Sequence, residues 1–236
     1  MNRIVSGITT RILKIGATRL TTSHEKIPAN DYLLPEIKLN EIIGFGAPQS
    51  ICILSSQIER PQDMVLPLGD LLSVAAICRH CAPQRVMEIG TFTGETTWTM
   101  ARNLPEESKI LTLDLPPDQI PQHFAAYAAG SAFSNTPEAL KIQQLYGWSQ
   151  SFDFSPYYGK MDLVFIDGDH SFDAVRNDTE HALKLAKQRG IIVWDDYRFL
   201  NCHESCRGVS EYLHSAMNLM PVRQLCGTRL AIMAVD

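Results

Sequence analysis

Short apolar segments alternate with longer amphipathic segments from residue 85 to the end of the chain, and this alternation is the strongest constraint on the fold. Five of the apolar segments have the length and composition of strands: residues 85–89, 110–114, 139–146, 161–167 and 191–195. Most of them are nearly continuous apolar runs, which is typical of strands buried on both faces of a parallel sheet. The alternation therefore predicts an α/β fold, with helices on both faces of a doubly wound, mostly parallel sheet.

The segments around these strands complete the predicted sheet. Helices are expected at residues 63–81, 120–130, 172–189 and 208–217. Ser171 can cap the third of these helices, and Gly190 is placed to end it. Two short strands, 221–225 and 229–235, flank Cys226-Gly227 and are typical of an antiparallel hairpin. The sheet is thus predicted to have seven strands, with this hairpin at its C-terminal end.

The chain divides into an N-terminal extension, residues 1–62, and a main domain, residues 63–236. The first 20 residues contain four basic residues and no acid, and one helical face there carries four isoleucines: Ile4, Ile8, Ile12 and Ile15. Three interpretations fit this segment: a membrane-surface helix, a transit peptide, and a lid or dimer arm packed on the main domain. The third is favoured, so the extension is expected to act as a lid or to form a homodimer or higher oligomer.

Composition argues against several functional classes. The 236 residues carry a formal net charge of −5, which disfavours a nucleic-acid-binding surface as the main function. We expect no transmembrane segment, because no apolar run reaches the roughly 20 residues that cross a bilayer. No secretory signal is expected either, and six scattered cysteines fit a reduced, cytoplasmic compartment. Cys78-x-x-Cys81 and Cys202-x-x-x-Cys206 meet the spacing of zinc sites only in part, so a zinc site is disfavoured, and Cys78, in an apolar helical stretch, is expected to be a buried thiol.

A glycine-containing turn follows the first of the five strands, in the sequence RVMEIGTFTGETTW. Strand, glycine turn and helix form the arrangement in which backbone N–H groups and a helix N-terminus face a ligand. The dinucleotide pattern G-x-G-x-x-G fails, because Phe92 and Glu95 occupy its second and third glycine positions. The pattern that remains is E-x-G-x-x-x-G, formed by Glu88, Gly90 and Gly94. A carboxylate at Glu88 suits a cation or a ribose better than a pyrophosphate.

Acidic residues end four of the predicted strands: Glu88, Asp114, Asp167 and the pair Asp195-Asp196. Ligands of open α/β sheets bind beyond the carboxyl ends of the strands, so these acids are expected at one rim of the sheet. Asp114 lies 24 residues after Gly90, where a carboxylate accepts hydrogen bonds from a ribose diol. The alternative for Asp114 is a turn residue before Pro116-Pro117.

Asp167, Asp195 and Asp196 could share one ion, because neighbouring parallel strands lie about 5 Å apart. Three carboxylates without cysteine or histidine are hard oxygen ligands, which suit Mg²⁺, Mn²⁺ or Ca²⁺. An uncompensated carboxylate cluster would repel itself, and this favours a bound cation. In the alternative, Asp195-Asp196 caps the following segment while Asp167 contacts an amine of the ligand.

Taken in series, these segments resemble class I S-adenosylmethionine-dependent methyltransferases in five motifs: EIGTFTGETT, LTLDLPP, YGWS, DLVFIDGDHS and RGIIVWDDY. The resemblance runs from about residue 66 to the end and implies a Rossmann-like form of the predicted sheet. Within that superfamily the chain is similar to cation-dependent O-methyltransferases of the catechol and caffeoyl-CoA type. It is more similar still to the macrocin-type enzymes, which methylate sugar or phenol hydroxyls.

The resemblance implies a role for each matching residue. The cofactor-binding positions are Glu88, Gly90, Thr91, Gly94, Asp114, Trp148, Ser149 and Asp167, of which Asp114 would bind the ribose and Trp148 and Ser149 would frame the adenine. The metal positions are Asp167, Asp195 and Asp196, with Mg²⁺ as the expected ion and Mn²⁺ or Ca²⁺ as alternatives. Catechol-type enzymes usually carry Asp-Asn at the last two positions, so Asp-Asp follows the macrocin-type pattern.

Two residues are candidates for the catalytic base. His170 falls where the catechol type has its catalytic lysine, and Asp169 is the acid that macrocin-type relatives could use. The expected reaction is in-line transfer of a methyl group from S-adenosylmethionine to a hydroxyl of a small molecule such as a phenol, a sugar or a natural product. Two alternatives stay open: a metal-independent methyltransferase and a non-catalytic, cofactor-binding regulatory subunit. A nicotinamide dehydrogenase is disfavoured by the missing glycines.

Overall fold

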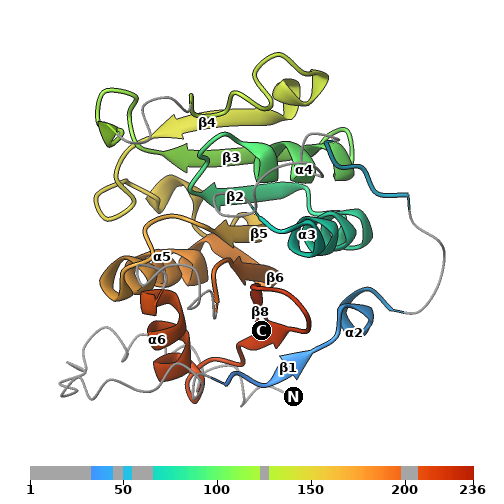
Figure 1. Cartoon of the computed structure of the whole chain (residues 1–236), viewed down its shortest axis with the longest axis vertical. Coiled ribbons are helices and arrows are strands. Elements are labelled where there is room, and N and C mark those ends of the chain that lie inside the picture. Colours follow the sequence, from blue (N-terminus) through green and yellow to red (C-terminus); the bar gives the residue numbers. More distant parts are fainter. Residues whose placement is uncertain (1–32, 45–49, 55–65, 123–127, 198–206) are drawn as a thin grey trace.

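A computed structural model describes residues 33–44, 50–54, 66–122, 128–197 and 207–236 (Figure 1). These residues form one eight-stranded sheet with the order β1-β7-β8-β6-β5-β2-β3-β4. The strands are β1 (Glu36–Ile37), β2 (Arg85–Ile89), β3 (Lys109–Asp114), β4 (Ile142–Tyr146), β5 (Met161–Ile166), β6 (Ala186–Trp194), β7 (Arg223–Leu225) and β8 (Ala231–Ala234). The predicted α/β fold with a mostly parallel sheet is confirmed.

The centre of the sheet is parallel and the C-terminal part is antiparallel. β2 pairs in parallel with β3 and β5, and β4 and β6 continue the parallel pairing on the two sides. β8 is antiparallel to both β6 and β7, which confirms the predicted hairpin. The chain leaves β2 toward β3 on one side and later returns to β5 on the other. This reversal creates a switch point, where open α/β sheets bind ligands beyond the carboxyl ends of the strands.

Helices cover both faces of the sheet (Figure 1). The helices are α3 (Leu68–Cys81) and α4 (Glu95–Asn103) on one face, and α5 (Phe172–Leu185) and α6 (Arg207–Ala216) on the other. In β5, Leu163 and Phe165 belong to the core under α3 and α4. Val164 and Ile166 belong to the core under α5 and α6. Side chains of a strand alternate between its faces, so a strand that is apolar throughout serves both cores.

The helix predicted at residues 172–189 is shorter than expected. Ser171 caps it as predicted, with Oγ accepting from the backbone N–H of Ala174, but the helix ends at Leu185. The prediction that Gly190 ends the helix is wrong, because residues 186–190 already belong to β6. Pairing of β6 with β5, which begins at Met161 and Ala186, outweighs the local helix propensity. A Cβ at Gly190 would lie 3.1 Å from the carbonyl oxygen of Met161, so glycine allows this close approach of the two strands.

Two other predicted elements differ in extent. The strand predicted at residues 139–146 begins only at Ile142, because a 3₁₀ helix, Pro137–Lys141, precedes it. Of the helix predicted at residues 120–130, residues 123–127 lie outside the described residues, and the described residues on either side carry no α-helix. The helices predicted at 63–81 and 208–217 correspond to α3 and α6.

The N-terminal extension contributes the eighth strand. β1 pairs in parallel with β7 at the edge of the sheet, and the short helix α2 (Leu39–Ile43) follows it. The seven-strand prediction missed β1 because two residues in a proline-rich segment carry no readable strand pattern. The basic segment of residues 1–20 lies outside the described residues, so its role as a lid or oligomerisation arm stays a prediction. Among the described helices, none is long and apolar enough to cross a membrane.

Candidate active site

The glycine loop after β2 packs directly against the end of β5. Gly90 has φ +98°, and a Cβ at this position would clash with the backbone carbonyl of Asp167. Gly94 has φ +82° at the N-terminus of α4, and a Cβ there would lie 2.6 Å from the ring of Phe133. Both positions therefore require glycine, for the backbone conformation and for space. The E-x-G-x-x-x-G pattern encodes a turn that is fixed against the neighbouring strand.

Asp114, at the end of β3, holds this loop in place. Its Oδ2 accepts hydrogen bonds from the backbone N–H groups of Thr91 at 3.0 Å and Phe92 at 2.6 Å. Its Oδ1 accepts from the N–H of Leu115 at 2.7 Å. A carboxylate offers about four acceptor positions, so one remains after these three bonds. The predicted bond from Asp114 to a ribose stays a prediction.

Glu88 lies behind the loop rather than in it. Its side chain is buried, and its Oε2 accepts from Thr97 Oγ1 at 2.5 Å and Thr112 Oγ1 at 2.6 Å. Burial raises the pKa of Glu88 to about 8, although the two threonine bonds oppose the shift. Thr91 belongs to the same network, because its Oγ1 contacts Thr112 Oγ1 at 2.6 Å. In this structure the Glu88 carboxyl joins β2, β3 and α4 beneath the predicted cofactor position.

Trp148 and Ser149 follow β4 at the same end of the sheet. The Trp148 side chain is 48% exposed, and its Nε1 donates to Gln119 Oε1 at 2.6 Å. The carbonyl oxygen of Ser149 accepts from Asn177 Nδ2 at 3.3 Å. The exposed indole therefore offers a flat apolar surface at this end of the sheet, which is the type of surface that an adenine stacks on. Contact of these residues with adenine stays a prediction.

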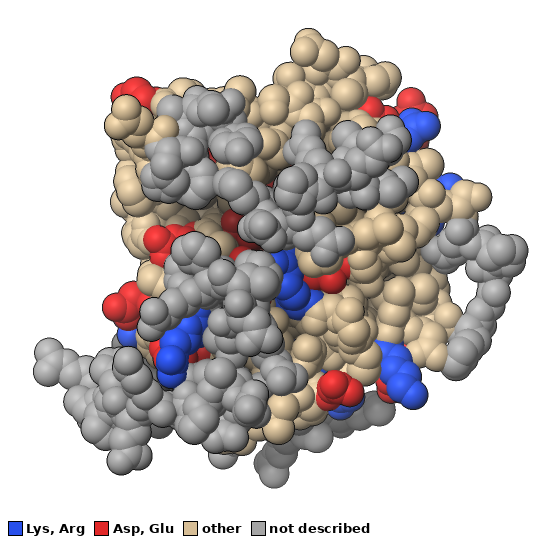
Figure 2. Space-filling model, viewed as in Figure 1, with Lys and Arg blue, Asp and Glu red and all other residues tan. Residues whose placement is uncertain are grey.

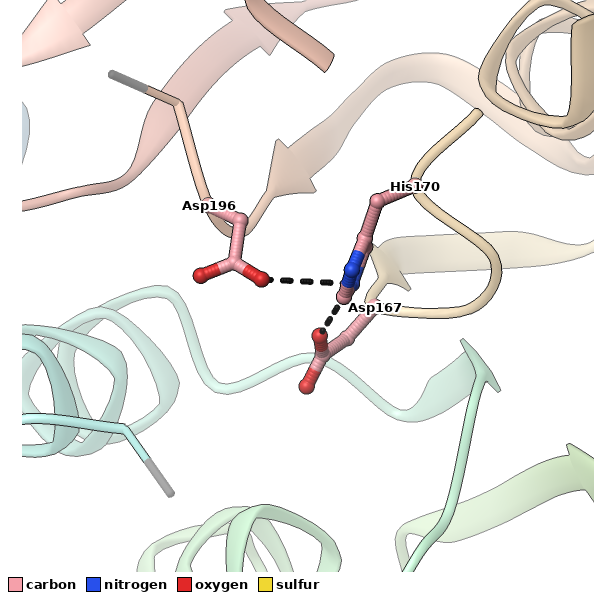
Figure 3. A group of neighbouring side chains, drawn as sticks. All are labelled: Asp167, His170 and Asp196. Atoms are coloured by element: carbon pink, nitrogen blue, oxygen red, sulfur yellow. Dashed lines mark ion pairs between the residues drawn. The ribbon is translucent and has the colours of Figure 1, made fainter. Parts of the chain in front are cut away.

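Three predicted site residues converge across the rim (Figure 3). His170 Nε2 lies 3.2 Å from Asp196 Oδ2 and 3.6 Å from Asp167 Oδ1. One ligand atom from each of these residues lies within 4.8 Å of the other two, a grouping that could hold a metal ion. Asp167 and His170 keep about a quarter of their side chains exposed, so the group is open to solvent on one side. We call Asp167, His170 and Asp196 the cation cluster.

Asp195 is not part of the cation cluster. Its side chain is 3% exposed, and its Oδ2 lies 3.6 Å from Arg229 Nη2. Arg229 also contacts Asp196 Oδ1 through Nη1 at 3.2 Å. Both its Nε, at 3.6 Å, and its backbone N–H, at 3.0 Å, face Asp70 Oδ2. In the view of Figure 2, acidic and basic side chains lie next to one another near the middle of the molecule.

Sequence reasoning missed both Arg229 and Asp70. Arg229 lies just before β8, and Asp70 lies in the first turn of α3, so no local pattern joins them to the acids of the rim. One signal was available, because Asp70 is an acid next to Leu71 in a helix that is otherwise apolar at this point. A buried acid usually has a buried partner.

Burial shapes the electrostatics of this rim. It raises the pKa of Asp195 well above the ordinary value, and the charges of Asp167 and Asp196 add to the rise while Arg229 opposes it. Burial also raises the pKa of Asp167, which the hydrogen bond with His170 opposes. Carboxylates that resist ionisation at one site favour a positively charged partner.

The cysteines described by the structure are Cys52, Cys78, Cys81 and Cys226, and all four are free thiols. Cys78 is fully buried, as expected, and burial raises the pKa of its thiol. Cys202, His203 and Cys206 lie outside the described residues. Among the described residues, the cation cluster is the group with metal-binding geometry, and it contains no cysteine.

Comparison with known proteins agrees with this geometry. Residues 87–197, which include the glycine loop and the cation cluster, match a family model described as a methyltransferase domain. This chain is similar to class I O-methyltransferases. The resemblance to methyltransferases predicted from the sequence motifs is thereby confirmed, whereas the greater similarity to macrocin-type enzymes stays a prediction.

Two named relatives are O-methyltransferases. The chain is 26% identical over 183 residues to catechol O-methyltransferase B of Danio rerio, a match that covers 73% of this chain and 63% of the relative. It is 28% identical over 118 residues to caffeoyl-CoA O-methyltransferase 3 of Nicotiana tabacum, covering 48% of this chain and 46% of the relative. The matches therefore span less than two thirds of the length of these relatives.

Solved structures share the fold. The O-methyltransferase TomG from Streptomyces achromogenes, in complex with SAM, matches with a TM-score of 0.56 and 21% identity over 77% of this chain and 86% of that chain. An O-methyltransferase from Bacillus cereus, in complex with SAH, matches with a TM-score of 0.53 and 18% identity over the same shares of the two chains. At this level of identity the matches establish the fold alone.

Proposed function

We propose that this chain transfers a methyl group from S-adenosylmethionine to a hydroxyl oxygen of a small molecule, at a site that also holds a divalent cation. The observation that carries the proposal is the packing of the glycine loop on the end of β5. Gly90 lies against the backbone carbonyl of Asp167, so the predicted cofactor loop and the cation cluster form one unit. In-line transfer depends on alignment of donor and acceptor, and a rigid connection between their two sites supports such alignment.

The residues of the loop fit the methyl donor. Asp114 keeps one acceptor position for a ribose hydroxyl after its three backbone bonds. Trp148 offers an exposed ring for the adenine. The sulfonium group is cationic, and the acids at the rim favour a positive charge there.

The cation cluster fits a divalent ion. Its two carboxylates and one imidazole are ligand types that such ions accept, and they converge from the ends of two neighbouring strands. A divalent ion at this place supplies Lewis acidity, which holds an acceptor hydroxyl and lowers its pKa. The residues that would hold it are Asp167, His170 and Asp196, with Asp195 behind them.

Asp169 and His170 are the candidates for the proton acceptor. Asp169 is exposed, and its Oδ1 accepts from the backbone N–H of Ser171 at 2.8 Å, which orients the carboxylate at the mouth of the site. In the proposed reaction, one of these groups takes the hydroxyl proton while the oxygen–methyl bond forms and the sulfur–methyl bond breaks. The products are a methyl ether, a protonated base and S-adenosylhomocysteine.

The test is transfer of labelled methyl groups from S-adenosylmethionine to a panel of phenols, catechols and sugars, with a divalent ion and with EDTA. We expect labelled product with the ion and loss of product with EDTA or with Asp167→Asn. Asp173→Asn is the matched control, because this acid lies nearby in the first turn of α5 but is 80% exposed and pairs with Arg176. Cofactor binding without turnover of any acceptor would point instead to a regulatory subunit.

One observation favours a metal-independent version of the same reaction. Arg229 already supplies a positive charge to Asp195 and Asp196, two of the three acids predicted to bind the metal. Full activity after stringent removal of metal ions, together with loss of activity in Asp169→Asn, would support this version.

A further inference from the structure

Asp195 and Asp196, which the sequence places in one metal site, have different sets of partners in the structure. Asp195 faces Arg229 through Oδ2, whereas Asp196 faces Arg229 through Oδ1 and His170 through Oδ2. The division follows from the backbone, because Asp196 has φ +59° and the chain turns sharply between the two residues. Asp195 thus lies behind the rim, and Asp196 lies at it.

The spacing within the cation cluster is close to that of ligands around one ion. Two ligand atoms that are each about 2.1 Å from an ion lie about 3.0–3.5 Å apart when they are neighbours in its coordination sphere. His170 Nε2 lies 3.2 Å from one carboxylate oxygen and 3.6 Å from the other. An ion can therefore be accommodated with small movements of the three side chains.

The charge balance around the cluster favours a dication. Among the described residues, Arg229 contacts Asp70, Asp195 and Asp196, and Asp167 adds a fourth carboxylate at the same rim. Asp195 lines a small cavity together with Asp167 and His170. Its Oδ1 is buried and accepts no hydrogen bond from the part of the chain that the structure describes. A buried carboxylate oxygen of this kind is stabilised by a cation nearby.

We infer that the cation site of this chain consists of Asp167, His170 and Asp196, that Asp195 lies behind it without binding the ion, and that the site prefers Mn²⁺ or Co²⁺ over Mg²⁺. The inference rests on the proposed function for its location and departs from the three-carboxylate set that the sequence resemblance implies. Arg229 is then a positioning residue, because it contacts both carboxylates of the Asp195-Asp196 turn, at 3.6 Å and 3.2 Å.

The metal preference follows from the nitrogen ligand. Mg²⁺ and Ca²⁺ favour oxygen ligands, whereas an imidazole ligand favours transition-metal ions, whose affinity for such sites rises from Mn²⁺ to Co²⁺. Replacing a carboxylate by His170 also removes one negative charge, which weakens binding of a hard ion more than that of a softer one. We therefore expect Mn²⁺ to bind about tenfold or more tightly than Mg²⁺.

The same assignment separates the two candidates for the base. A His170 nitrogen that binds the ion has no lone pair left to accept a proton. Asp169 then remains as the proton acceptor, with its carboxylate oriented by the N–H of Ser171.

The deciding experiment is pulsed electron paramagnetic resonance of Mn²⁺ bound to the full chain with S-adenosylhomocysteine. The expected result is modulation from a directly coordinated nitrogen, which changes when histidine is labelled with ¹⁵N. His170→Gln should remove the modulation, and Asp195→Asn should retain it. Calorimetry should show that His170→Gln reduces the preference for Mn²⁺ over Mg²⁺, whereas Asp195→Asn lowers both affinities in parallel.

Three results would overturn the inference: bound Mn²⁺ without nitrogen coupling, no binding of Mn²⁺ at all, or loss of the metal preference only in Asp195→Asn. Binding of S-adenosylhomocysteine to each variant reports correct folding, independently of the metal. Failure of the proposed function is a separate outcome, because it is measured by methyl transfer. Mn²⁺ binding with nitrogen coupling but no methyl transfer would support the cation site and contradict the proposed activity. Methyl transfer without bound metal would support the activity and contradict the cation site.

Discussion

The two halves of the candidate site are stabilised in different ways. In the cofactor half, around the loop after β2, hydrogen bonds dominate: Asp114 accepts three backbone N–H groups and Glu88 accepts two threonine hydroxyls. In the cation half, charges dominate, because Asp70, Asp195 and Asp196 converge on Arg229. Hydrogen bonds between neighbouring groups fix the conformation of the loop. A counter-charge that several carboxylates share sets only the local charge balance, which a bound ion can change.

This difference has a functional consequence. A methyl donor that binds the first half requires a preformed loop, and neighbouring strands hold that loop through short-range contacts. The second half can adjust when an ion binds, because Asp167 and His170 are partly exposed and pair with each other at 3.6 Å. Substitutions in the two halves should therefore separate donor affinity from metal affinity.

The largest effect is expected from Arg229→Met, which leaves Asp70 and Asp195 buried without their partner. Breaking a buried ion pair from one side costs about 3–5 kcal/mol of unfolding free energy. Denaturant unfolding in EDTA measures the loss, and added Mn²⁺ should recover part of it. Arg102→Met is the control: Arg102 pairs with Glu138 but is 52% exposed, so its loss should cost less than about 1 kcal/mol. Equal losses in the two variants would show that Arg229 is not a buried counter-charge.

Gly90→Ala should have the next largest effect, and it acts on the contact between the two halves. The new Cβ would meet the carbonyl of Asp167, and alanine disfavours φ +98°, so we expect a loss of about 2–4 kcal/mol in stability. Binding of S-adenosylhomocysteine should also be lost in calorimetry. Gly159→Ala isolates the backbone contribution, because Gly159 has φ +67° with open space around it. This substitution should lower the free energy of unfolding by only about 1 kcal/mol.

Asp114→Asn should weaken the cofactor half alone. An asparagine cannot accept all three N–H groups, because one of its side-chain oxygens becomes an NH₂ donor. Loss of charge-assisted hydrogen bonds is worth about 1.5–3 kcal/mol, which corresponds to about 10–100-fold weaker binding of S-adenosylhomocysteine. Asp118→Asn, at an exposed acid in the following loop, should leave that affinity unchanged. A parallel loss of Mn²⁺ affinity in Asp114→Asn would contradict the separation of the two halves.

The sequence predicted the strand, glycine loop and helix of the cofactor half because their signals are local, whereas the cofactor-binding roles stay predictions. Apolar strands end in acids, and Gly90 and Gly94 follow the first of these strands at fixed spacing. The order of residues along the chain therefore predicts that these residues lie near one another at the rim of the sheet. The same local reasoning predicted the fold of β2, β3 and β5, whose burial on both faces is visible as continuous apolar runs.

The sequence could not predict the cation half in the same way. Asp70 and Arg229 are separated by 159 positions and meet only through the packing of α3 beside the C-terminal hairpin. The direction of Asp195 depends on the positive φ of Asp196, which no residue pattern indicates. Tertiary pairing also decided the end of α5, where Ala186 joins β5 although the residues that follow it favour a helix.

The last expected effect concerns Glu88 and is visible only as a pH dependence. Burial raises its pKa from 4.5 to about 8, so the folded chain holds this proton more tightly than the unfolded chain. The stability from Glu88 is thus fully present below pH 4.5 and is lost as the pH rises through about 8. The slope is at most about 1.4 kcal/mol per pH unit.

Glu88→Gln tests this directly, because the amide oxygen can still accept from Thr97 and Thr112 while the titrating group is gone. We expect denaturant unfolding to show a flatter fall in stability between pH 5 and pH 8 than in the unaltered chain. Glu107→Gln, at an exposed glutamate, should keep the original slope. An unchanged slope in Glu88→Gln would mean that the carboxyl is ionised in the fold. The cofactor half would then contain a buried charge, as the cation half does, and the contrast between the two would fail.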